Sequence, residues 1–266
     1  APSCILGTPR APMHEPYRLA FFALLGLHGV WWLPQLCATH RRILSSAGRC
    51  LCSWPWWRAA DRAVVCVPMA LLISSTEAAL VQAGLGAQSA DVVARGLVAA
   101  QRDGRGAHGL ARLPAIVRSL RSGEAAAAAA PKIVALRPAV LQVDADRGLA
   151  LPAIAHALPA LARCAREHGV AVLSVVEARG IIGALWAPLE RMASEHGLAA
   201  LACCNSPAFV ACAGGTRRVF GTNPIGFAWP RAASPPLVVD FACAATSRGD
   251  MQQAARRGEP LPPGCA

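Results

Sequence analysis

The spacing of apolar positions changes character about a quarter of the way along the chain. After residue 73, amphipathic stretches alternate with short apolar runs, and glycines or prolines separate them. The amphipathic stretches predict helices that begin at a capping box formed by Ser74–Glu77, at Ser89, and near residues 113, 152 and 185. The apolar runs predict strands at 140–143, 170–176, 198–203, 225–229 and 237–240, with 170–176 buried. Alternating helices and strands predict an α/β fold built as α+β layers.

The first 73 residues show no such periodicity and are expected to form a poorly ordered extension outside a domain spanning 74–266. Within them, residues 19–38 form an apolar, almost uncharged run that is long enough to span a membrane. His28 and Pro34 interrupt the run, and a basic stretch follows it at residues 40–42. A membrane-anchored binding protein is therefore kept as an alternative, although the extension is the favoured interpretation.

Composition narrows the class of protein further. Hydrophobic residues make up 55% of the chain and charged residues only 15%, which argues against disorder in most of it. The net charge of +11 comes almost entirely from scattered arginines, and there is a single tyrosine. Nucleic-acid binding needs a clustered basic patch with aromatic residues, so it is not expected. The positive charge is better explained by a binding site for a small anionic substrate or a phosphate-bearing cofactor than by a nucleic-acid surface.

The eleven cysteines do not indicate a metal or disulfide framework. Their number is odd, and no pair of C-x-x-C motifs with histidines occurs. No metal site is therefore expected. Free cysteines are typical of a reduced compartment, so a cytoplasmic protein is the expectation.

The segment 102–114 carries the clearest candidate chemistry. His108 lies between small residues on flexible backbone, and a histidine gives or takes a proton near neutral pH. Arg112 follows four residues later, so one turn of helix would place it on the same side as His108. Its planar guanidinium is suited to binding a carboxylate. A proton donor beside a carboxylate ligand is what the reduction of a 2-oxo or 2-imino acid requires. By spacing alone, a surface turn without catalysis remains the commoner explanation.

Two later segments offer polar groups at turns. Thr222 lies in the tight turn 221–224, for which the alternative is a hairpin that binds nothing. A strand ends at Asp240 and a helix begins near Thr246, an arrangement that favours phosphate or other anions. Asp250 is placed to orient a histidine, and the alternative is a carboxylate in the first turn of a helix. The G-x-G-x-x-G motif of Rossmann dehydrogenases is absent from the whole sequence.

Several strings in order resemble the malate/L-lactate dehydrogenase family, a non-Rossmann group of NAD(P)-dependent oxidoreductases. The amino-acid strings are most similar to those of its Δ1-piperideine-2-carboxylate and Δ1-pyrroline-2-carboxylate reductases. The matching strings cover residues 103–114, 169–175, 183–190, 197–206, 220–230 and 235–240. The resemblance runs from about Ser74 to Ala266 and implies a family fold that is incomplete at the C-terminus.

The resemblance also implies roles for individual residues. His108 is the proton donor, Arg112 binds the substrate carboxylate, Thr222 contacts substrate, and Asp250 belongs to a Ser-His-Asp relay. The residues implied to bind NADP or NAD are Ile181, Ile182, Gly183, Ala184, Leu185, Asp240, Phe241 and Ala242. The implied reaction moves a hydride to or from a small 2-oxo or 2-hydroxy acid or a cyclic imino acid, and the implied assembly is a homodimer.

Three departures from the family pattern bear on activity. Ala107 stands where the relay has its serine, and residues 178–182 replace a cofactor loop that carries two histidines. The chain also ends before further cofactor-binding sequence of the family. Arg179 is a candidate ligand for a cofactor phosphate. The alternatives are thus an oxidoreductase with reduced or lost activity and an inactive fragment.

Overall fold

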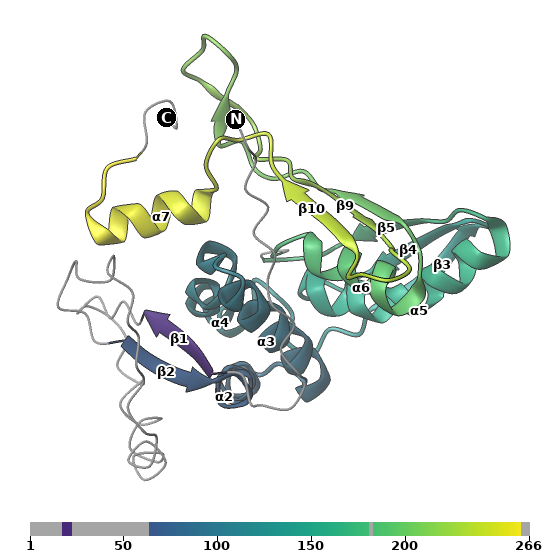
Figure 1. The fold of residues 1–266 in the computed structure, drawn as a ribbon, viewed down its shortest axis with the longest axis horizontal. Coiled ribbons are helices and arrows are strands. Elements are labelled where there is room, and N and C mark those ends of the chain that lie inside the picture. The colour runs from purple at the N-terminus through teal and green to yellow at the C-terminus, as the bar shows by residue number, and fades with distance from the viewer. Residues whose placement is uncertain (1–17, 23–63, 181–182, 262–266) are drawn as a thin grey trace.

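The computed structural model describes residues 18–22, 64–180 and 183–261 (Figure 1). The helices, including two short 3₁₀ turns, are α2 (Met69–Gln82), α3 (Ala87–Arg102), η3 (Gly106–His108), η4 (Leu110–Arg112), α4 (Leu113–Arg121), α5 (Ala150–His168), α6 (Trp186–His196) and α7 (Arg248–Arg257). The strands are β1 (Arg18–Phe22), β2 (Val64–Pro68), β3 (Lys132–Arg137), β4 (Val140–Asp144), β5 (Val172–Val176), β6 (Ala200–Cys203), β7 (Val210–Ala211), β8 (Arg218–Phe220), β9 (Ile225–Trp229) and β10 (Leu237–Phe241).

Two three-stranded sheets form the centre of the layered part. In the first, with the order β3-β4-β5, β4 pairs in parallel with β5, and α5 makes the crossover between them. In the second, with the order β10-β9-β6, all pairing is antiparallel and α6 packs against one face. The predicted α/β class with helix and sheet layers is confirmed.

Helices α2, α3 and α4 build a separate apolar core beside the sheets. In α3 the buried residues recur at helical spacing: Ala90, Val93, Ala94, Leu97 and Val98. The first four of these pack with Leu80 of α2, Leu120 of α4 and other buried residues of these helices. This core positions the short η3 and η4 turns, because Leu110 of η4 packs against it and η3 lies against α3.

The helix starts predicted from serines are wrong in two places. Helix α2 begins at Met69, so Ser74 lies inside it, and its hydroxyl donates to Leu71 O at 3.1 Å instead of capping. The Thr76 hydroxyl likewise donates to Leu72 O at 2.7 Å. Helix α3 begins at Ala87, after Gly86, so Ser89 is not its cap. A serine followed three residues later by an acid fits a helix interior as readily as a helix start.

The strand predicted at 170–176 forms as β5, but it is not buried as expected. Val172 is 55% exposed, because β5 lies at the edge of its sheet. Strand β3 was not predicted, and it pairs with β4 through a register that shifts between Ala135 and Arg137. Gly169 ends α5 with a positive φ of 80°, which a glycine adopts without strain.

The apolar run 19–38 lies outside the described residues except for 19–22, which belong to β1. Within the ranges that the structure describes, none of the helices has the length and apolar character to cross a membrane. Helix α2 runs through residue 74, where the domain was expected to begin.

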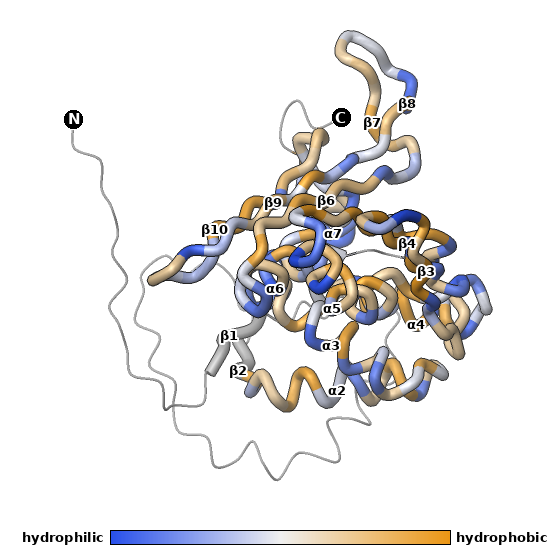
Figure 2. Tube along the Cα trace, turned by 90° about the vertical axis from the view of Figure 1, so that its right-hand side faces the viewer, coloured by the Kyte–Doolittle hydropathy of each residue, from blue (hydrophilic) through white to orange (hydrophobic). Residues whose placement is uncertain are grey.

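One face of the β10-β9-β6 sheet carries apolar side chains that α6 does not cover, and it is called the outer face here. Its exposed large residues are Leu201, Trp229, Leu237, Val239 and Phe241. Figure 2 shows hydrophobic residues along β6 and β9 at this edge of the layered part. Alternate residues of the same strands, such as Ala228, face α6 and are buried.

Candidate active site

The turn that carries His108 is fixed by its packing against the end of α3. The backbone N–H of His108 donates to Arg105 O at 2.8 Å, which closes the η3 turn. The side-chain oxygen of Gln101 accepts from Leu110 N at 3.3 Å. Between them, Gly109 has no room for a side chain, because a Cβ atom would come within 2.9 Å of the Gln101 backbone nitrogen. The glycine beside His108 is therefore required by close packing.

Arg112 is held in the next turn, η4. Its Nε donates to Ala107 O at 2.6 Å, so the guanidinium folds back toward the residue before His108. The terminal Nη2 lies directly against Gly249 of α7, so close that a Cβ atom there would collide with it. Helix α7 is drawn apart from the two sheets in Figure 1, and this contact joins its first turn to η4, while Gly249 also lies against Ala107 of η3.

Asp250 lies in the first turn of α7, as the non-catalytic alternative predicted. Ser247 caps this helix, and its Oγ accepts from Asp250 N at 3.0 Å. The Ser247 hydroxyl also donates to Oδ2 of Asp250 at 2.6 Å. The carboxylate is thus held in one orientation at the end of α7 that meets η3.

The charges of these groups act on one another. Burial, and secondarily the Arg112 charge, lowers the pKa of His108, whereas Asp250 and Asp240 act in the opposite direction. Burial and the nearby Arg248 charge lower the pKa of Arg112, which nevertheless stays protonated at neutral pH. The fold therefore brings His108, Arg112 and Asp250 together from two segments about 140 residues apart.

The turn that carries Thr222 is hydrogen-bonded to two other segments of the chain, at Ser206 and at Cys243. Its backbone N–H donates to Ser206 Oγ at 2.8 Å, and the two hydroxyl oxygens are 3.1 Å apart. Asn223 accepts from Ser206 N at 3.2 Å and adopts a positive φ of 41°. Cys243 N donates to Thr222 O at 3.0 Å, which attaches this turn to the segment after β10. Ser206 was not predicted as a site residue; the sequence indicated it only as part of the string 197–206 that resembles the family.

The two segments predicted to bind a nicotinamide cofactor meet at one hydrogen bond. Asp240 accepts from the backbone N–H of Trp186 at 3.0 Å, at the first residue of α6. Gly183–Leu185 precede that residue, and Phe241, which follows Asp240, is 59% exposed. By the alternation of side chains along β10, Phe241 lies on the outer face of the sheet, opposite α6. Ile181 and Ile182 lie outside the described residues.

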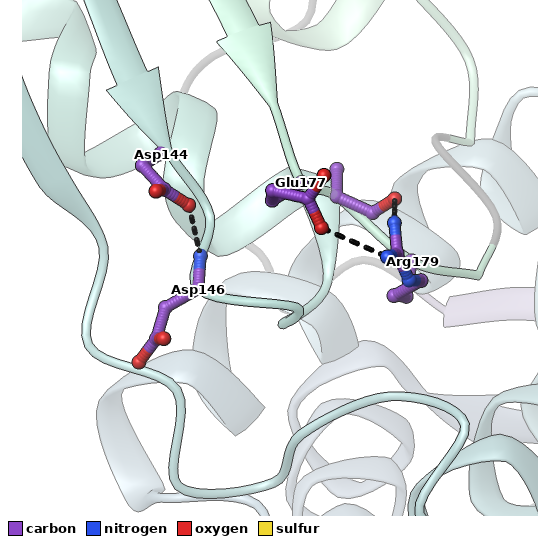
Figure 3. Close-up of polar contacts among 5 residues, drawn as sticks. Asp144, Asp146, Glu177 and Arg179 are labelled. Carbon is purple, nitrogen blue, oxygen red and sulfur yellow. Dashed lines mark hydrogen bonds and ion pairs between the residues drawn. The ribbon is translucent and has the colours of Figure 1, made fainter.

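Arg179 is engaged in another contact. Its guanidinium pairs with Glu177 at 2.8 Å, in the loop that follows β5 (Figure 3). In the neighbouring loop after β4, Asp144 accepts from the Asp146 backbone N–H at 2.8 Å. Among the residues that the structure describes, no group of three or more histidine, cysteine or acidic side chains is arranged to hold a metal ion.

Sequence patterns did not indicate Arg248. Its guanidinium carbon lies 4.3 Å from the ring centroid of Phe209, in a cation–π contact. The residue directly precedes Gly249, against which Arg112 packs. Arginine at a helix start has no sequence signature, because only the folded chain brings it near Phe209.

A sequence profile described as malate/L-lactate dehydrogenase matches residues 67–266. The chain is 43% identical over 187 residues to Delta(1)-pyrroline-2-carboxylate reductase of Ancylobacter novellus, covering 70% of this chain and 54% of the relative. It is 42% identical over 189 residues to (2R)-3-sulfolactate dehydrogenase (NADP(+)) of Chromohalobacter salexigens, covering 71% and 56%. The chain thus spans about half the length of the curated relatives it matches.

Solved structures agree with the sequence matches. The crystal structure of delta1-piperideine-2-carboxylate reductase from Pseudomonas syringae pvar. tomato is similar with a TM-score of 0.69 and 40% identity, covering 74% of this chain and 58% of that one. A dehydrogenase from Sinorhizobium meliloti gives a TM-score of 0.70 at 33% identity, covering 74% and 57%. The family resemblance and the fold expected from it are confirmed.

Proposed function

Since the chain belongs to the malate/L-lactate dehydrogenase family, we propose that it carries the substrate-binding and proton-transfer residues of an NAD(P)-dependent oxidoreductase. The substrate is a small 2-oxo acid or a cyclic imino acid in the direction of reduction, and a 2-hydroxy or cyclic amino acid in the other. The packing of the α7 start, which carries Asp250, against η3 and Arg112, beside His108, is the observation that carries the proposal.

Arg112 binds the carboxylate of the substrate. Its Nε donates to Ala107 O, and Nη2 lies beside Gly249. A bound carboxylate places C2 of the substrate beside the imidazole, since the two groups are adjacent in the acid. The negative charge also offsets the Arg112 charge that lowers the pKa of His108. Substrate binding thereby favours the protonated imidazole that reduction needs.

His108 moves the proton of the reaction. During reduction, the double bond from C2 to oxygen or nitrogen loses its π pair to that heteroatom, and the imidazolium N–H gives it a proton. In the reverse direction the neutral imidazole takes the proton back. Asp250, oriented by Ser247, favours the charged imidazole, and Thr222 contacts the substrate from its own turn. Ala107 leaves the histidine without the serine partner of the family relay.

Residues 181–185 and 240–242 hold the cofactor, NADP or NAD. When bound, its nicotinamide supplies the hydride to C2 in reduction and accepts it in oxidation. The Asp240–Trp186 hydrogen bond fixes these two segments against each other. We further propose a cytoplasmic homodimer. The relative from C. salexigens has NADP(+) in its name, which favours the phosphorylated cofactor.

The experiment is a steady-state assay of NADPH oxidation with Δ1-piperideine-2-carboxylate and with 2-oxo acids, on the chain and on its His108→Gln variant. We expect a loss of about 10²–10⁴-fold in kcat for the variant, because a general acid contributes that much. His156→Gln is the matched control, since His156 is exposed on α5. Equal turnover by the His108→Gln variant and the original chain would contradict the role of this residue.

A second measurement separates binding from turnover. Titration of NADPH with detection of its fluorescence reports cofactor binding in the absence of any reaction. Binding without turnover would identify a chain that holds the cofactor but is catalytically inactive, whereas an absence of both would overturn the proposed function.

A further inference from the structure

We propose that Ser206 is a positioning residue for the substrate. Its hydroxyl donates to Thr222 Oγ1 and thereby directs the Thr222 hydroxyl hydrogen toward an oxygen of the substrate acid. The inference rests on the proposed function, in which Thr222 contacts the substrate. It adds to that function a residue that acts through Thr222 without touching the substrate itself.

Backbone contacts fix these two residues relative to each other. The Thr222 N–H donates to Ser206 Oγ at 2.8 Å, and Thr222 O accepts from Cys243 N at 3.0 Å. The Ser206 N–H donates to Asn223 Oδ1 at 3.2 Å. Each polar backbone group of Thr222 thus has a partner inside the protein, so a ligand that approaches this residue engages chiefly its hydroxyl.

Close packing keeps the two hydroxyl groups within reach of each other. Their oxygens are 3.1 Å apart. Gly221, directly before Thr222, has no space for a side chain, because a Cβ atom there would collide with the carbonyl oxygen and with Oγ of Ser206. Ser206 and Thr222 are both half-buried, so neither residue is sealed inside the protein.

The direction of the hydrogen bond between the hydroxyls follows from their other contacts. A hydroxyl group has one hydrogen to donate and two lone pairs to accept. Ser206 Oγ already accepts the Thr222 N–H, and a hydroxyl that accepts one hydrogen bond becomes a better donor. Its acceptor is Thr222 Oγ1. The hydrogen of the Thr222 hydroxyl is then not used within the pair and points away from Ser206.

In the opposite direction, Thr222 would donate to Ser206 Oγ, and Ser206 would offer its own hydrogen to a ligand. Only the chain that runs from the Thr222 N–H through Ser206 to Thr222 Oγ1 ends on the residue proposed to contact the substrate. A carboxylate at the end of this chain makes the last hydrogen bond charge-assisted and strengthens the others. The bound acid therefore selects this direction.

Isothermal titration of pyrrole-2-carboxylate in the presence of NADPH measures acid binding without turnover, because this acid has a carboxylate but no imine or 2-oxo group to reduce. We expect Thr222→Val to weaken binding by about tenfold or more, as for the loss of one hydrogen bond to a charged group. Ser206→Ala should weaken it by about threefold to tenfold, because the Thr222 hydroxyl remains but loses its orientation.

The double variant separates positioning from a purely structural role. In the Thr222→Val background there is no hydroxyl to direct, so Ser206→Ala should leave the affinity unchanged within about twofold. The Tm should fall equally in both backgrounds, because Ser206→Ala removes the acceptor of the residue 222 N–H in each. An affinity loss of the same size in both backgrounds overturns the inference.

Ser194→Ala is the matched control, since Ser194 is exposed on α6 and its hydroxyl donates within that helix, to Glu190 O at 2.7 Å. It should bind pyrrole-2-carboxylate as the original chain does. Ser206→Cys introduces a thiol that forms only weak hydrogen bonds, and it should show the same loss as Ser206→Ala if the latter does not fold. Unchanged affinity in the Ser206 variants overturns the inference.

The proposed function fails by a different result. Turnover that is lost in His108→Gln, together with full acid binding by Thr222→Val, would keep the proposed activity and overturn this inference. Acid binding that follows the expected cycle, without turnover of any acid, would leave the inference standing while contradicting the activity. An original chain that binds no acid overturns both.

Discussion

The protonation of His108 depends on two opposing influences. Burial and Arg112 lower the pKa of this imidazole from its ordinary 6.5, while Asp250 and Asp240 raise it. The net direction is downward, so the free protein holds mostly neutral imidazole at pH 7. A neutral imidazole serves as the base for oxidation of a hydroxy acid, and reduction needs the protonated form.

The pH profile tests this assignment. For reduction, kcat/KM should fall as the pH rises through a value below 6.5, because the free protein then loses the proton of His108. The profile of kcat should fall at higher pH than that of kcat/KM, since the bound carboxylate offsets Arg112. For oxidation, kcat/KM should rise through the same low value. Identical profiles for the two reduction parameters would contradict the coupling between Arg112 and His108.

Gly249 is the second residue whose surroundings predict a measurable effect. Replacing a helix glycine by alanine ordinarily stabilises by about 0.5–1 kcal/mol. In Gly249→Ala, however, the new Cβ would meet Arg112 Nη2 and approach Ala107 O to 2.8 Å. We expect weaker substrate binding, seen as a KM raised by about tenfold, because one lost charged hydrogen bond has that effect.

Gly96→Ala supplies the comparison for that variant. Gly96 lies inside α3, and its nearest neighbour for a Cβ is Leu151 Cδ1 at 3.4 Å, an ordinary contact distance. Thermal unfolding should show Gly96→Ala stabilised, with an unchanged KM. A Gly249→Ala variant that matches Gly96→Ala in both measurements would show that the close approach of α7 to Arg112 has no role.

At the scale of elements, α7 is the one described α-helix whose first turn has a side-chain cap. Ser247 satisfies the Asp250 N–H and orients the Asp250 carboxylate, and the contacts of α7 with other elements are chiefly with η3. Ser247→Ala should cost α7 about 1 kcal/mol, whereas Ser247→Thr should retain the cap. Hydrogen exchange of the α7 amides is the measurement, and equal protection in all three proteins would exclude this dependence.

Most elements were predictable because they follow local rules. The strand 225–229 and the helix that ends at Gly169 have clear apolar periods and a glycine in the left-handed region. The failures come from tertiary context. Nothing local distinguishes Ser74 inside a helix from a cap, and the exposure of Val172 depends on which strand lies at the sheet edge. Likewise, spacing placed His108 near Arg112, but only the fold brings Asp250 and Arg248 to them.

At the scale of the whole molecule, the outer face of the β10-β9-β6 sheet is an exposed apolar surface of the layered part. Leu201 is 65% exposed and Leu237 50%, in strands that flank β9. Contiguous apolar surface of this kind favours association.

The Leu201→Thr/Leu237→Thr variant should bind less of a hydrophobic dye and scatter less light at high concentration. Val81→Thr, on an isolated exposed residue of α2, should change neither quantity. Unchanged dye binding in the double variant would show that this face is covered in solution.

The order of strands in that sheet also has a consequence for synthesis of the chain. Strand β6 is hydrogen-bonded only to β9 within the sheet, and β9 is made more than twenty residues later. At about 5–20 residues per second, the ribosome leaves β6 without its partner for about one to five seconds. During that interval Leu201 and Cys203 belong to an unpaired edge, so slower elongation through residues 204–229 should lengthen the exposure of this strand to chaperones.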